Sequence, residues 1–222
     1  MIEHPEVPLA VRAQLLATEH WSLLATRSQT WNEVMGRISA QFTFASASLV
    51  VLAVSQQVVG MSNAFRFLAV WLAVAVLITG SLTALRVRNA SQEDMLLVVA
   101  MNRLRAAYVA IDPTIAEHLV TGWSDDDAGV TRTYVMGLPR RRLATVFASA
   151  FIFAGTVNAI VAAGLGAVIA GAAGAPDWAT LVLSGATGVA YFFLVVYPAH
   201  RGYSRTARSW TVRFPGQTSE LG

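Results

Sequence analysis

Four long stretches of this chain carry no charged side chain, and this pattern constrains its fold more than any other feature. They cover residues 42–59, 67–85, 143–169 and 179–199. A helix rises about 1.5 Å per residue, so roughly 20 apolar residues cross the hydrocarbon core of a bilayer. The sequence therefore predicts an all-α polytopic membrane protein with four transmembrane helices.

The composition fits this prediction. The 222 residues are 55% hydrophobic and only 13% charged, whereas soluble domains have about a quarter charged residues. Cysteine is absent, which excludes disulfides, thiolate metal sites and cysteine nucleophiles. The first residues, MIEHPEVPLAVRAQLL, lack the basic start and apolar core of a signal peptide, so we expect the first helix to stay attached.

The distribution of arginine predicts the orientation. All sixteen basic residues are arginine, and the two short loops at 60–66 and 171–178 hold only one of them, Arg66. Because cytoplasmic segments are enriched in basic residues, both termini are expected in the cytoplasm. Arginine without lysine, together with abundant Ala, Val and Gly, indicates a GC-rich bacterial genome and hence the bacterial inner membrane. The enrichment of basic residues in cytoplasmic segments also explains the pI near 9.8, so we expect no nucleic-acid partner.

Arginines also flank the last two predicted spans. Three immediately precede the third span, and four follow the fourth in a basic tail at residues 200–222, three of them within its first nine residues. Such clusters suit anionic lipid headgroups. The candidates are Arg140, Arg141, Arg142, Arg201, Arg205 and Arg208.

Two apolar stripes predict cytoplasmic helical arms. Residues 1–41 are expected to form an amphipathic helix continuous with the first span, and residues 86–142 a second arm and a connector. Together the arms predict an antiparallel helical hairpin that reaches about 40 Å into the cytoplasm. The first stripe is Ala17, Trp21, Leu24, Ser28, Trp31, Met35, Ile38 and Phe42; the second is Val87, Ala90, Asp94, Leu97, Met101, Leu104, Tyr108 and Ile111.

Each stripe has one polar break, and the two breaks lie at the same height in the predicted hairpin. They are Ser28 and Asp94, with Arg27 adjacent. A polar residue in a helical seam usually determines register or oligomeric state. The alternative is that water enters the seam at this point.

The first span is the least apolar of the four. Gln41, Ser48 and Ser55 recur at heptad spacing with Ala45 on the same face, and Thr43, Ser46, Gln56 and Gln57 add further polar groups. One interpretation is polar packing between helices, which is common in membranes. The other is a hydrated pathway lined by the first helix of several subunits.

Small residues form ridges in the last two spans, which let helix backbones approach closely. The third span also carries Asn158, which needs a partner in hydrocarbon. Whether the ridges pack within a subunit or between subunits is left open. They consist of Gly155, Ala159, Ala163, Ala167 and Gly171 in the third span, and of Ser184 and Gly188 in the fourth.

Three consecutive aspartates, Asp125, Asp126 and Asp127, form the main acidic cluster. Carboxylates bind Ca²⁺ or Mg²⁺, so a divalent-cation site is one interpretation. The other is a helix start, with Ser124 as the N-cap and acidic residues in the first turn.

The sequence offers little for catalysis. It has no nucleophile elbow, no phosphate-binding loop and no histidine pair at metal-ligand spacing. No carboxylate lies inside a predicted span, which disfavours proton- or sodium-coupled transport. We therefore expect neither an enzyme nor a cofactor.

Two functional hypotheses follow. The first is a homo-oligomeric channel or pore-like assembly, joined through the spans and the cytoplasmic arms. The second is a membrane-anchored scaffold or signalling module that recruits a cytosolic protein and has no permeation pathway. The sequence leaves open the permeating solute, the gating stimulus and the identity of any partner.

Overall fold

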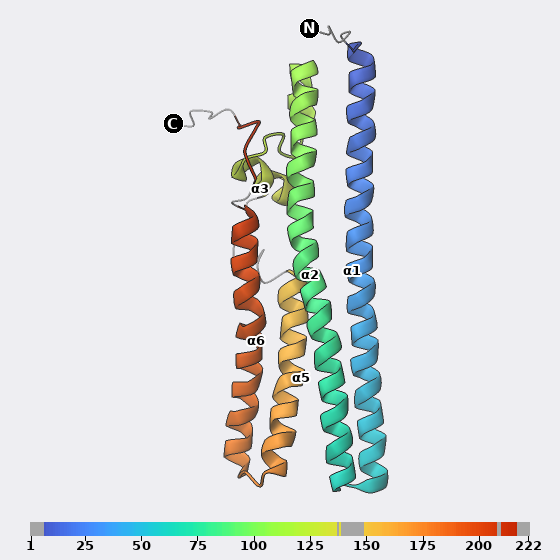
Figure 1. Cartoon of the computed structure of the whole chain (residues 1–222), viewed down its shortest axis with the longest axis vertical. Coiled ribbons are helices and arrows are strands. Elements are labelled where there is room, and N and C mark those ends of the chain that lie inside the picture. The colour runs from blue at the N-terminus through green and yellow to red at the C-terminus, as the bar shows by residue number, and fades with distance from the viewer. Residues whose placement is uncertain (1–6, 137, 139–148, 208–209, 217–222) are drawn as a thin grey trace, which may run out of the picture. The chain divides into compact units, whose positions relative to one another are not determined.

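The computed structural model describes residues 7–136, 138, 149–207 and 210–216. Every regular element in these residues is a helix (Figure 1). In chain order they are α1 (Leu9–Val59), α2 (Asn63–Ile111), the 3₁₀ helix η1 (Pro113–His118), α3 (Asp127–Val135), α5 (Ala150–Ala172) and α6 (Asp177–Ala207).

Four of these helices, α1, α2, α5 and α6, are long and apolar enough to cross a membrane. The first begins at Leu9 and continues through residue 41 without a break, in line with the expected continuity of the first arm and first span. The third expected span begins at residue 143, but residues 143–148 lie outside the described residues and α5 begins at Ala150.

The chain divides into two compact units. Unit 1 comprises Met1–Trp31, Ser91–Arg141 and Thr206–Gly222. Unit 2 comprises Asn32–Ala90 and Arg142–Arg205. Helices α1 and α2 each contribute one part to each unit.

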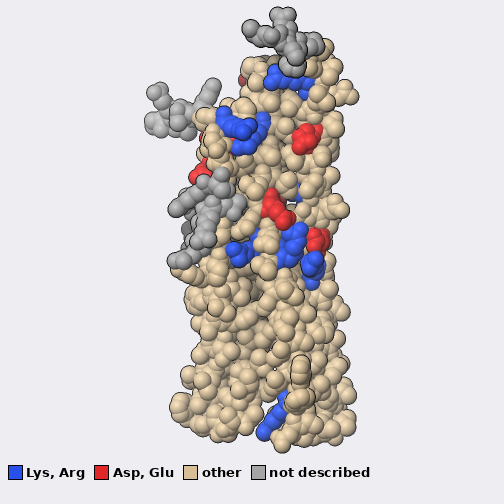
Figure 2. Space-filling model, viewed as in Figure 1, with Lys and Arg blue, Asp and Glu red and all other residues tan. Residues whose placement is uncertain are grey.

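Polar side chains connect the helices of unit 2. Gln41 Nε2 on α1 donates to the Val76 carbonyl of α2 at 2.9 Å. The hydroxyls of Ser81 on α2 and Tyr191 on α6 are 2.7 Å apart. On the face seen in Figure 2, an uncharged surface covers the apolar length of these helices. These hydrogen bonds join α1 to α2 and α2 to α6.

The small-residue ridges of α5 and α6 meet within unit 2. Ser184 Oγ donates to the Ala163 carbonyl at 2.8 Å. A Cβ added to Gly188 would lie 2.9 Å from the Ala159 carbonyl oxygen, so only glycine allows the two backbones to come so close. These ridges therefore pack inside one subunit, at least at these positions.

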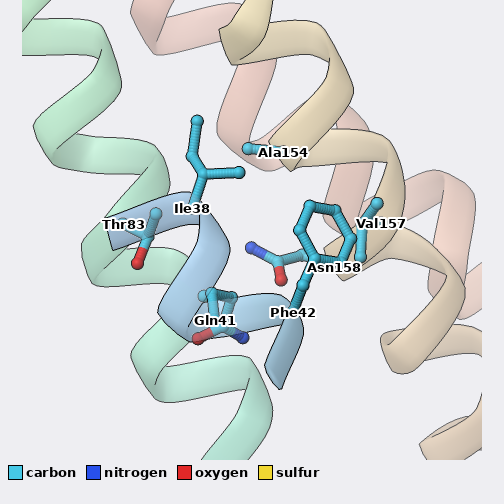
Figure 3. A pocket seen from close by; sticks show the side chains of 8 residues that line it. Ile38, Gln41, Phe42, Thr83, Ala154, Val157 and Asn158 are labelled. Carbon is cyan, nitrogen blue, oxygen red and sulfur yellow. The ribbon is translucent and has the colours of Figure 1, made fainter. Parts of the chain in front are cut away.

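A small pocket lies between α1, α2 and α5 in unit 2 (Figure 3). Asn158 of α5 is 2% exposed and turns its amide toward Ile38 and Gln41 of α1. A Cβ added to Gly80 of α2 would overlap that amide. Asn158 thus depends on a glycine opposite it for the space that its side chain occupies.

Unit 1 is built around the second half of α2. Four buried side chains form its apolar core, and Leu23 of α1, Tyr134 of α3 and Trp210 pack against them. The core residues are Val98, Val99, Met101 and Val130.

The packing face of α1 differs from the predicted stripe. Trp21 and Met35 are exposed by 71% and 48%, whereas Val34 is fully buried and Arg27 is half-buried. Ile38, a member of the predicted stripe, is buried too, so the stripe is correct at Ile38 and wrong at Trp21 and Met35. The predicted stripe of α2 holds better, because Val87, Ala90, Asp94 and Met101 are all buried.

We expect Gly80→Ala to destabilise unit 2, because the new methyl group would displace the Asn158 amide. Overpacking of this kind costs about 1–3 kcal/mol. The double variant Gly80→Ala/Asn158→Ala should regain part of the loss. Thermal unfolding in detergent, followed by circular dichroism, measures both effects.

Gly164→Ala provides the matched control, because a Cβ at Gly164 meets no atom within 4 Å. It should leave the unfolding temperature unchanged or raise it slightly, since alanine favours helix over glycine. Equal losses at Gly80 and Gly164 would contradict the specific contact with Asn158.

Candidate functional site

A buried carboxylate on α2 gathers side chains from three helices of unit 1. Asp94, 3% exposed, accepts hydrogen bonds from Arg27 Nε at 2.6 Å and Trp31 Nε1 at 2.8 Å, both on α1. Tyr134 of α3 donates its hydroxyl to the other carboxylate oxygen at 2.7 Å. We call Arg27, Trp31, Asp94 and Tyr134 the Asp94 cluster.

The Asp94 cluster includes two of the three residues predicted to determine the register of the arms. Arg27 contacts Asp94, whereas Ser28 is exposed. Trp31 belongs to the predicted apolar stripe, and Tyr134 belongs to none of the predicted sites. The indole N–H and the phenol O–H were the available signal, because buried Trp and Tyr usually find an acceptor.

A second buried carboxylate lies at the start of α3. Asp125 is fully buried, and Arg103 Nε of α2 donates to it at 2.8 Å. Asn102 Nδ2 holds the neighbouring Ser124 carbonyl at 2.8 Å, and Ser124 Oγ donates to Asp126 at 2.8 Å. We call Arg103, Ser124, Asp125 and Asp126 the Asp125 cradle.

The Asp125 cradle holds the C-terminal segment Trp210–Gly216, which we call the tail segment. The backbone N–H groups of Arg213 and Phe214 donate to the Asp125 carboxylate at 3.0 and 2.8 Å. Gly216 N donates to Asp126 at 2.7 Å. The indole of Trp210 donates to the Asp125 carbonyl at 2.9 Å.

These donors determine the charge of Asp125. Burial disfavours the carboxylate, but hydrogen bonds from Arg103, Arg213 N and Phe214 N outweigh it and hold the pKa of Asp125 below its ordinary value. Burial likewise opposes ionisation of Asp126, yet bonds from Gly129 N, Gly216 N and Ser124 lower its pKa. Both side chains are therefore anionic at neutral pH.

The triple aspartate begins a helix, but the capping residue is not Ser124. Asp126 is the N-cap of α3 and accepts from Gly129 N at 2.8 Å, while Asp127 is exposed in the first turn. Among the described residues, no group of three or more His, Asp or Glu side chains is placed to hold a metal ion. The oxygens of Asp125 and Asp126 instead accept hydrogen bonds from protein groups.

The predicted pore-lining residues lie on the inner face of α1 in unit 2. Ser48 is 6% exposed and donates to the Phe44 carbonyl, and Gln41 donates to α2. Ala45 and Ser55 are half-buried on the same face. By contrast, the exposed uncharged polar residues within 42–59 of α1 are Thr43, Ser46, Gln56 and Gln57.

The predicted lipid-headgroup arginines fall largely outside the described part of the chain. Arg140, Arg141, Arg142 and Arg208 lie outside the described residues. Arg201 and Arg205 belong to α6, but their side chains are not described. Their contact with lipid stays a prediction.

No protein family, curated protein or solved structure matches this chain. Its function is therefore argued from its own residues.

Replacing Asp94 should destabilise unit 1 strongly. Asp94→Ala would leave three donors without their acceptor, and breaking a buried ion pair costs about 3–5 kcal/mol. Tyr134→Phe removes one bond to the carboxylate and should cost about 1.5–3 kcal/mol. Chemical unfolding in detergent measures the series, with Glu33→Gln as the control because Glu33 makes only exposed ion pairs. Equal effects of Glu33→Gln and Asp94→Ala would contradict the importance of the buried cluster.

Asp125 should make unit 1 sensitive to acid. Because its folded pKa is lowered, its contribution is present above the unfolded pKa of about 3.9 and is lost as pH falls through the folded value. The stability difference between the unchanged chain and Asp125→Asn should thus be large at pH 7 and shrink below about pH 4. Asp127→Asn is the control, because Asp127 is exposed. A pH-independent difference for Asp125→Asn would contradict the assignment.

Proposed function

We propose that this chain is a membrane-anchored scaffold or signalling module of the bacterial inner membrane, with unit 1 as its interaction head. The four long apolar helices support a membrane anchor. The arginine distribution supports cytoplasmic termini, which would leave the two short loops outside the cell. A module of this kind needs no permeation pathway.

The inward orientation of the polar face of α1 favours the module over a channel. A channel lined by the first helix of several subunits needs that face to point away from its own subunit. Instead, Gln41 donates to the Val76 carbonyl, and Ser48 is buried. Because both side chains face their own subunit, neither is presented to a pathway shared with other subunits.

Unit 1 offers an apolar surface for a protein partner. Trp21 and Leu24 of α1 are exposed by 71% and 41%. They lie beside the packing face of α1, three residues apart and therefore on the same side of the helix. Exposed tryptophan is a frequent anchor of protein interfaces, so we assign partner binding to this surface.

A homo-oligomeric channel is the second candidate. It is favoured by the outward polar residues Thr43, Ser46 and Gln57 of α1, which are exposed. In hydrocarbon such groups associate with neighbouring helices or line water. A pathway built from them would use a different face from the one that the sequence pattern indicated.

A photo-crosslinking experiment tests the module. A photo-reactive phenylalanine placed at Trp21 should give a product with one cytosolic protein in living cells, because this side chain is exposed. The same group at Val120, which is 66% exposed elsewhere in unit 1, is the control. A product at Trp21 with twice the mass of the chain would instead favour a homo-oligomer.

Cysteine labelling and ion flux test the channel in the same preparation. Because the chain has no cysteine, Ser46→Cys and Ser48→Cys each introduce a single thiol. The module predicts no flux in proteoliposomes across a range of voltage, pH and calcium, and no reaction of either thiol with a water-soluble maleimide. Flux together with labelling of Ser46→Cys alone would establish the channel and overturn the module.

A further inference from the structure

The tail segment contacts unit 1 in the manner of a bound peptide. Its hydrogen bonds come from backbone groups at positions 213, 214 and 216 and from one indole, that of Trp210. The Thr211 carbonyl also accepts from Arg103 at 2.7 Å, and Asp125 N donates to the Phe214 carbonyl at 3.1 Å. The five side chains from Thr211 to Pro215 are exposed. Unit 1 therefore contacts the tail segment mainly through the backbone, between Trp210 at one end and Gly216 at the other.

Both ends of the tail segment have side-chain requirements. Trp210 packs against the apolar core of unit 1. At the other end, a Cβ added to Gly216 would lie 3.1 Å from Asp126 Oδ2 and 3.2 Å from Ser124 Oγ, so a larger residue would have to push these two side chains aside by a few tenths of an ångström. Pro215, which has no N–H, stands between the two donors Phe214 and Gly216.

Several side chains of the Asp125 cradle are held by contacts that do not involve the tail segment. Arg103 binds Asp125, Gly129 N and Ser124 Oγ bind Asp126, and Asn102 binds the Ser124 carbonyl. Without the tail segment, however, the buried Asp125 carboxylate would lose both backbone donors. Because the tail segment itself covers this carboxylate, water would replace those donors in the empty cradle, and a peptide that supplies two backbone N–H groups can take the place of that water.

We propose that the Asp125 cradle is a peptide-binding site for extended segments, and that the chain's own tail segment is its resident ligand. The ligand class is an extended peptide with a tryptophan at one end, two consecutive free backbone N–H groups, and a proline–glycine pair at the other. A segment in trans binds only when the resident tail leaves. This inference rests on the contacts in unit 1 and does not depend on the proposed function.

A cleavable tail tests the exchange in the full chain. A protease site is inserted between Ala207 and Trp210, and the purified protein is cut in detergent. The released tail fragment should stay bound through gel filtration and be displaced by excess synthetic peptide of residues 210–216. The uncut protein should bind the fluorescent peptide at least about tenfold more weakly than the cut protein after displacement, because the tethered tail is present at an effective concentration near millimolar.

Peptide variants identify the specific contacts without altering the protein. The peptides Trp210→Ala and Gly216→Ala should each bind at least about tenfold more weakly, whereas Val212→Ala should bind as well as the unchanged peptide, because Val212 is exposed. In the protein, Asp125→Asn should weaken binding about 10- to 100-fold, as expected for lost bonds to a charged group.

Two results would overturn the proposal. One is equal affinity of the Gly216→Ala, Trp210→Ala and Val212→Ala peptides, which would mean that the cradle does not recognise the segment. The other is loss of helicity or aggregation as soon as the tail is cut, which would make the segment an inseparable part of the fold. If Asp125→Asn fails to fold, the peptide series alone decides.

Discussion

Two buried carboxylates on or beside α2 hold unit 1 together. A buried charge that loses its partner costs more than a well-formed pair contributes, so each carboxylate requires its donors nearby. Asp94 draws donors from α1 and α3, and Asp125 draws them from α2 and the tail segment. Segments distant in the sequence are therefore held around α2 by electrostatics, and the apolar core beneath them is small.

The long apolar helices were predictable, because the absence of charge depends on each residue alone and not on a distant partner. The packing face of α1 was predictable only in part. Apolarity indicated Ile38, which is buried, but also Trp21 and Met35, which are exposed. It did not indicate Arg27, through which the helix contacts Asp94. An arginine is expected at the surface unless a buried partner for it is known. The partner of Arg27 is Asp94, which lies 67 positions away in the sequence. On α2 the prediction succeeded because Val87 and Ala90 are apolar in their own right.

The candidate site likewise has one part that the sequence predicted and one part that it did not. The acidic run at residues 125–127 indicated a helix start, and α3 begins there with Asp126 as its cap. The tail segment left no such signal. Its contacts use backbone N–H groups, which every residue except proline carries, and its exposed side chains follow no pattern. Recognition of main chain cannot be read from residue types, and only Trp210 and Gly216 carry a specific requirement.

The two units use polar groups for different purposes, and this difference bears on function. In unit 2, side chains such as Gln41 and Ser184 donate to carbonyls of a neighbouring helix, which satisfies these polar groups without a charge. In unit 1, the carboxylates of Asp125 and Asp126 bind the tail segment, which has no regular structure. Bonds between packed helices are hard to exchange, whereas an extended segment held by its backbone can be replaced by another of the same chemistry. This contrast supports the proposal that binding belongs to unit 1 and that the apolar helices of unit 2 supply an anchor.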